Sequence, residues 1–160
     1  FLFREAAEIG MSHTHTINHL IKTELYQYGM LQKIKQEAEY MDTTVNQKKI
    51  RVAVLMGGAS NEKEISLESG RNITYKLSPH TYEALPIFIN SNMELFHITQ
   101  SLLVRSSTQE IASLVTPEMR IRWHDLPKIA DFVFIGLHGG HGENGAVQGT
   151  LEMLELPYNG

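Results

Sequence analysis

The sequence contains no cysteine, and it has a single tryptophan among its 160 residues. Without thiols the chain can form neither a disulfide nor a thiolate metal centre, so its stability has to come from a packed interior. No uninterrupted apolar stretch approaches the roughly 18 residues that a membrane-spanning helix needs. The amino terminus also lacks the charged, apolar and small-residue order of a signal peptide. We therefore expect a cytoplasmic protein with no membrane partner.

Excess positive charge is also missing. The formal net charge is −4, which argues against nucleic acid as the main partner. Hydrophobic residues make up 42% and charged residues 20% of the chain, as in ordinary globular proteins. The length suits one domain with an appendage.

The first part of the chain has a helical pattern that stands apart from the rest. Between about residues 14 and 40, apolar residues recur every three or four positions, which predicts an amphipathic helix with a break near Gly29. These residues are Ile17, Leu20, Ile21, Leu25, Tyr28, Leu31 and Ile34. The polar stretch 42–47 is typical of a linker. We predict a helical extension and linker over 1–47 and a separate domain over 48–160. The apolar helix face would need a partner, either in this chain or in a homodimer.

From residue 48 onward, strand and helix patterns alternate. Alternation of this kind predicts an α/β fold with a doubly wound, mostly parallel sheet, and ligands then bind at the carboxyl ends of the strands. The stretch 90–128 is irregular and predicts only a short strand and one helix. The expected strands are 49–56, 82–89, 94–98 and 131–137, and the expected helices are 62–77, 107–115 and 145–155.

Two glycine-rich loops follow the apolar strands 49–56 and 131–137. Glycine allows positive φ angles and close backbone approach, and a helix amino terminus presents unpaired N–H groups to an anion. The second loop, 138–149, also contains the titratable residues His138, His141 and Glu143. Both loops are therefore candidate binding sites for a small molecule.

Together the loops resemble two motifs of the D-alanine–D-alanine ligase family, of the ATP-grasp superfamily. The closing stretch 156–160 is also similar to the family's exit from its first domain. One departure is Asn144, where the family usually has Asp; if this position caps a helix, Asn serves nearly as well. The matching residues of the first motif are Gly57, Gly58, Ser60, Glu62, Glu64, Ser66, Leu67, Ser69 and Gly70, and those of the second are His138, Gly139, Gly142, Glu143, Gly145, Val147, Gln148 and Gly149.

The resemblance implies a Rossmann-like pre-ATP-grasp domain, preceded here by the amphipathic helix. It further implies an enzyme that joins two D-alanines for peptidoglycan synthesis through a D-alanyl phosphate. ATP and magnesium would be bound by domains absent from this chain. The chain begins at Phe1 and stops at Gly160, so we expect an amino-terminal piece that is inactive alone. Residues outside it would decide whether the second substrate is D-alanine, D-lactate or D-serine.

The resemblance also assigns roles to individual residues. Glu62 would be the catalytic carboxylate that holds the ammonium group of the first D-alanine, and His138 would lie near that substrate's carboxylate. The plain alternatives are an acidic residue favoured by the helix dipole and a histidine bonded to a neighbouring carbonyl. The substrate-binding set is Glu62, His138, Gly57, Gly58, Ser60 and Gly139.

Three other interpretations are weaker. A metal-dependent hydrolase could use His138, His141 and Glu143, but ligands within a glycine loop have no rigid element to fix them, so we expect no metal site in this chain. The second interpretation is a non-catalytic binding or regulatory module of the same fold. A dinucleotide site is the third, but the spacing after Gly57 lacks the three glycines of that fingerprint. Glu64 is expected to be structural, and His15 and His19 to lie on a solvated helix face.

Overall fold

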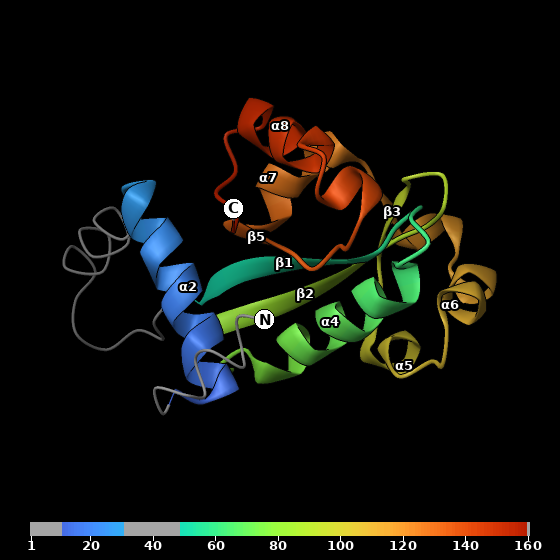
Figure 1. Ribbon diagram of the computed structural model, residues 1–160, viewed down its shortest axis with the longest axis horizontal. Coiled ribbons are helices and arrows are strands. Elements are labelled where there is room, and N and C mark those ends of the chain that lie inside the picture. Colours follow the sequence, from blue (N-terminus) through green and yellow to red (C-terminus); the bar gives the residue numbers. More distant parts are fainter. Residues whose placement is uncertain (1–10, 31–48, 160) are drawn as a thin grey trace.

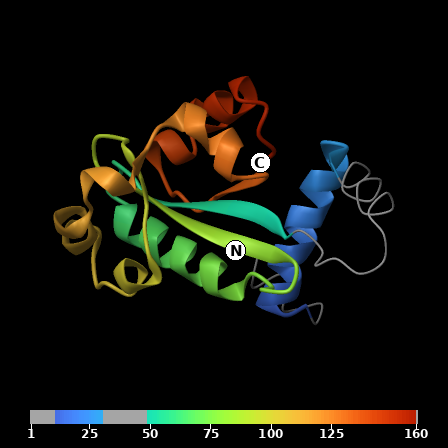
Figure 2. The same ribbon diagram turned by 180° about the vertical axis from the view of Figure 1, so that it is seen from behind.

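The computed structural model describes residues 11–30 and 49–159. In this part of the chain, one sheet lies between two layers of helices (Figure 1). Helices α4 (Lys63–Lys76), α5 (Gln100–Leu103) and α6 (Thr108–Leu114) lie on one side of the sheet. Helices α7 (Leu126–Ile129) and α8 (Ala146–Met153) cover the other, as the reverse view in Figure 2 also shows. The arrangement confirms the predicted open α/β sheet.

The sheet has five strands in the order β4-β3-β2-β1-β5. Strand β1 lies in the centre and pairs in parallel with β2 on one side and β5 on the other. The short strands β3 and β4 are antiparallel to their neighbours, so the parallel part is limited to the strands beside β1. The bounds are β1 Ile50–Gly57, β2 Tyr82–Ile89, β3 Leu95–His97, β4 Arg120–Ile121 and β5 Phe132–Ile135.

The stretch 90–128 contains the predicted strand and helix, observed as β3 and α6, together with several elements that the sequence did not predict. These are α5, α7, β4 and two 3-10 turns, Pro117–Met119 and Trp123–Asp125. Each is four residues or shorter, too short to show a period of 3.6 or 2. A third 3-10 turn, Gly140–Gly142, lies in the second glycine loop.

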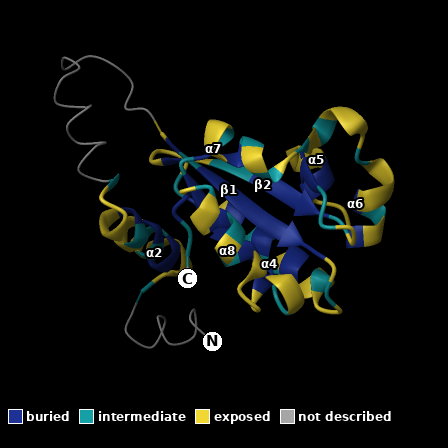
Figure 3. Cartoon of the chain, turned by 90° about the horizontal axis from the view of Figure 1, so that it is seen from above, coloured by how far each residue is buried: buried dark blue, intermediate teal, exposed yellow. Residues whose placement is uncertain are grey.

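Apolar side chains of the strands point to both faces of the sheet, as expected for a parallel sheet covered on both sides. On β1, Val52, Val54 and Met56 belong to the core under α4, whereas Ala53 and Leu55 belong to the core under α7 and α8. The strands are dark blue in Figure 3, and the outer faces of the helices are exposed. The two cores hold the carboxyl ends of the strands in place.

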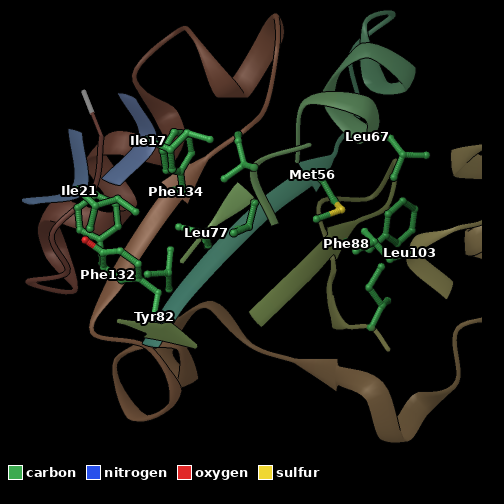
Figure 4. Packing of buried hydrophobic residues seen from close by; sticks show 14 of the residues in the cluster. Ile17, Ile21, Met56, Leu67, Leu77, Tyr82, Phe88, Leu103, Phe132 and Phe134 are labelled. Carbon is green, nitrogen blue, oxygen red and sulfur yellow. The ribbon is translucent and has the colours of Figure 1, made fainter. Parts of the chain in front are cut away.

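The leading helix α2 (His13–Gln27) packs against the same sheet. Its side chains at positions i, i+4 and i+8, Ile17, Ile21 and Leu25, are fully buried in the cluster that contains Phe132 and Phe134 (Figure 4). The predicted helix therefore exists and finds its apolar partner within the chain. The remainder of its predicted span, 31–40, lies outside the described residues, as does the linker 42–47, and the domain boundary itself stays a prediction.

The ends of α2 have local causes. At its start, the Ser12 hydroxyl accepts a hydrogen bond from the backbone N–H of His15, a standard amino-terminal cap. At its end, Gly29 has φ +69°, a left-handed conformation that favours glycine and stops a helix. The break predicted near Gly29 is confirmed. Among the described residues, no helix is both long and apolar enough to cross a bilayer.

Candidate functional site

The two glycine loops meet at the carboxyl edge of the sheet. The first leaves β1 at Gly57 and leads to Glu62, which immediately precedes α4. The second leaves β5 and carries His138 and Gly139. Because β1 and β5 are adjacent and parallel, their ends lie side by side. The fold thus brings together two motifs about 80 residues apart in the sequence.

Ser60 joins the two loops directly. Its hydroxyl donates to the carbonyl oxygen of His138 at 2.6 Å and accepts from the backbone N–H of Glu62 at 3.1 Å. One side chain therefore fixes the backbone on both sides of the site. The half-buried bond to the carbonyl of His138 is costly to leave unmade, so it restricts the relative position of the loops.

Ser66, on the first turn of α4, makes a second connection. Its fully buried hydroxyl accepts from the backbone N–H of His138 at 2.8 Å and donates to the carbonyl oxygen of Glu62 at 3.1 Å. The backbone N–H and C=O of His138 are thus both bonded to serines of the first motif. The geometry holds Glu62 and His138 beside each other before any ligand arrives.

The imidazole ring of His138 has two different neighbours. Its Nε2 lies 2.8 Å from the Ser69 hydroxyl, and its Nδ1 lies 3.9 Å from a carboxylate oxygen of Glu143. The His138 side chain is 39% exposed and that of Glu143 is 61% exposed. The hydroxyl fixes the ring plane, while Nδ1 faces the open side of the site.

The glycines make the close approach of the loops possible. At Gly57, with φ +86°, an added Cβ would lie 2.6 Å from the carbonyl oxygen of Ile89, so no side chain fits. Gly139, with φ +67°, lies against Ser60 and Glu62, and a Cβ there would contact both at 3.5 Å. Gly57 and Gly58 line a small cavity of about 10 Å³ together with His138 and Gly139, which is room for about one water molecule. Glu62 does not line this cavity, so its carboxylate faces a separate, open surface.

Two carboxylates, those of Glu62 and Glu143, lie beside His138 at the open surface. Ligand atoms of Glu62, His138 and Glu143 all lie within 4.8 Å of one another. No lysine or arginine of ranges 11–30 and 49–159 forms an ion pair with either carboxylate. Such a surface suits a cationic group, because an ammonium or a metal ion would neutralise the two carboxylates.

Two residues that complete this arrangement, Ser66 and Ser69, were predicted only as motif matches, and Glu143 only as a possible metal ligand beside His138 and His141. The serines follow Glu62 by four and seven positions, a spacing that places all three on one face of a helix. That spacing is the signal that could have identified them. His141, by contrast, is exposed and does not join Glu62, His138 and Glu143.

Two neighbouring motif residues have structural roles. Glu64 accepts hydrogen bonds from the backbone N–H of Thr108, at 3.1 Å, and from its hydroxyl, which ties α4 to the start of α6. The carboxamide oxygen of Asn144 accepts from the backbone N–H of Ala146 at 3.1 Å, at the start of α8. Asn144 therefore closes a turn just before α8, whose amino-terminal cap residue is Gly145, and an Asp carboxylate could accept the same hydrogen bond.

The comparisons with known proteins agree with this geometry. Residues 51–160 match the family model described as D-ala D-ala ligase N-terminus. The D-alanine–D-alanine ligase of Desulforudis audaxviator is 38% identical over 110 residues, which cover 69% of this chain and 27% of that protein. The ligase of Bacillus anthracis is 32% identical over 111 residues, with the same coverage.

Solved structures show the same similarity. The D-alanine–D-alanine ligase from Coxiella burnetii superposes with a TM-score of 0.55 at 31% identity, over 69% of this chain and 34% of that one. The VanG D-Ala:D-Ser ligase from Enterococcus faecalis has a TM-score of 0.53 at 24% identity, which supports the fold alone. The chain spans about a third or less of the length of these relatives. On these matches and on the two loop motifs, the chain belongs to the D-alanine–D-alanine ligase family, whose amino-terminal domain it carries.

Proposed function

We propose that this domain forms one wall of the pocket for the first D-alanine in an ATP-dependent ligase. The ligase joins two D-alanines through a D-alanyl phosphate. In this proposal the carboxylate of Glu62 binds the substrate ammonium group, and His138 lies near the substrate carboxylate. Ser60, Gly57, Gly58 and Gly139 shape the loops that hold these two residues.

One observation carries the proposal. Glu62 and His138 come from separate motifs, yet Ser60 and Ser66 bond to the backbone of both and hold them side by side. A small zwitterion needs opposite partners at its two ends. A carboxylate beside an imidazole offers this pair. Prior placement of the two groups reduces the entropy lost when the substrate is aligned for reaction.

ATP and magnesium belong to the parts of the ligase outside this chain. The cluster at the open surface of the site consists of Glu62, His138 and Glu143, two carboxylates and an imidazole, which do not suit a triphosphate. Phosphate neutralisation and the transfer step therefore require other domains. We expect residues 1–160 alone to release no phosphate from ATP in the presence of D-alanine.

A chimeric ligase tests the proposal. Residues 51–160 would replace the matching amino-terminal domain of the Bacillus anthracis ligase, and D-alanine-dependent phosphate release would be measured. We expect activity, and we expect Glu62→Gln to raise the KM for D-alanine while the KM for ATP stays unchanged. A folded chimera without activity would instead favour a non-catalytic module. A change confined to the KM for ATP would contradict the assignment of this domain to the amino-acid pocket.

A further inference from the structure

The open surface of the site has the composition of a transition-metal centre. Glu62, His138 and Glu143 each offer one ligand atom, and these atoms lie within 4.8 Å of one another. A zinc ion with ligand bonds of about 2.0–2.2 Å would hold such atoms roughly 3.4 Å apart. Glu62 and Glu143 are exposed, so small rotations of their side chains can close the difference.

The imidazole ring of His138 is oriented so that Nδ1 could bind a metal ion. Ser69 holds Nε2 at 2.8 Å, which leaves Nδ1 toward Glu143 at 3.9 Å. Metal-bound histidines typically have their second nitrogen fixed by such a polar neighbour, which sets the tautomer and the ring orientation. The backbone of His138 is further fixed by Ser60 and Ser66. From the sequence we considered His141 rather than Glu62 as the third ligand, and we expected no metal site because a glycine loop does not fix its side chains. The hydrogen bonds that join His138 to Ser60, Ser66 and Ser69 supply that fixation.

We propose that Glu62, His138 and Glu143 bind a zinc ion. One imidazole and two carboxylates suit zinc better than magnesium, which prefers six oxygen ligands. A fourth position would remain open to water. If Glu62 also binds the substrate ammonium, as proposed above, zinc and D-alanine compete for the same carboxylate, and zinc would inhibit the ligase. The zinc site itself does not depend on that second step.

The experiment is a calorimetric titration of Zn²⁺ into the 160-residue chain. His15 and His19 are exposed and lie one helical turn apart, so they could bind zinc independently. The titration therefore uses a His15→Ala/His19→Ala background. We expect one zinc per chain in this background. We expect Glu143→Gln to weaken binding at least about tenfold, and Ser69→Ala about tenfold, as for other residues that orient a ligand.

Glu155→Gln is the matched control, because Glu155 is an exposed glutamate outside the cluster. It should bind zinc like the background protein. Unchanged affinity in Glu143→Gln, or an equal loss in Glu155→Gln, would overturn the proposal. The absorption spectrum of bound Co²⁺ reports coordination geometry and gives a second measurement. Ser69→Ala should change this spectrum if Ser69 orients the metal-bound imidazole, whereas a general loss of stability would not. Failure of zinc binding would leave the D-alanine proposal untouched, since the chimera tests that separately.

Discussion

The bodies of the strands and their carboxyl ends are built in opposite ways. Along β1, residues Val52 to Met56 are fully buried and belong to the two apolar cores on either side of the sheet. A few residues further on, the loops after β1 and β5 are held by serine hydroxyls bonded to backbone groups, and their charged side chains face outward. Burial of apolar surface fixes the first region, and directional hydrogen bonds fix the second.

The difference shows how stability and function are separated in this domain. Replacing a residue in the strand body removes packing that the whole fold shares, whereas replacing Glu62 or Glu143 removes a charge at an exposed surface. The first kind of change should act on the free energy of unfolding. The second should act on ligand binding and leave folding almost unchanged.

The strongest test of the strand body is Phe132→Ala. Phe132, on β5, is fully buried in the cluster that contains the apolar face of α2, and truncating a buried phenylalanine costs about 3–5 kcal/mol. Urea unfolding followed by circular dichroism measures the loss. Tyr75→Ala, at a ring that is 51% exposed, is the control and should cost far less. Equal losses would contradict the burial of Phe132.

The second test asks whether α2 belongs to the strand body. Ile21→Ala should lower the free energy of unfolding by about 2–5 kcal/mol, because Ile21 is fully buried on the sheet. Ile65→Ala, on the exposed side of α4, serves as the matched control. We expect the chain without residues 1–40 to unfold cooperatively but at lower denaturant concentration, since its sheet loses the cover of α2. Non-cooperative unfolding would place α2 inside the domain.

A change at the strand ends should affect binding instead. In the chimeric ligase, Glu62→Gln should lower the apparent affinity for the first D-alanine roughly ten- to a hundredfold. A loss of this size corresponds to one charge-assisted hydrogen bond, which contributes about 1.5–3 kcal/mol. The thermal midpoint should barely change, because Glu62 is exposed and its side chain takes no part in the packed interior. His138→Ala should act on the same substrate more weakly. A large drop in the midpoint for Glu62→Gln would show that the strand ends share the stability of the strand bodies.

The smallest effect concerns Tyr158, on the segment that follows α8. Burial, together with a 2.9 Å hydrogen bond to Glu152, raises the pKa of Tyr158 to about 12. An unfolded tyrosine loses its proton near pH 10, so the unfolded chain releases this proton first and stability falls as the pH rises from about 10 to 12. Tyrosinate absorbance should show a component that titrates near pH 12 and disappears in Tyr158→Phe. A Tyr158→Phe titration identical to that of the parent chain would contradict this assignment.

Several features could be predicted from the sequence because their causes are local. The continuous apolar runs predicted β1, β2 and β5, and spacings of three and four predicted α2, α4 and α8. The two glycine loops were predicted to lie at the carboxyl ends of the strands, and they do, after the adjacent strands β1 and β5. The other elements between β2 and β5, namely α5, α7, β4 and two 3-10 turns, were missed because each is too short to show a helical or strand period.

The sequence by itself determined the alternation of strands and helices, and with it the parallel pairing around β1 and the edge at which we expect ligands to bind. It also contained the two motifs that identify the family. Only the tertiary structure decided which side chains meet at that edge. Ser66 and Ser69 reach His138, and Glu143 rather than His141 completes the charged surface with Glu62. Those contacts join segments about 70 to 80 residues apart, and their geometry follows from the pairing of β1 with β5, which no local pattern encodes.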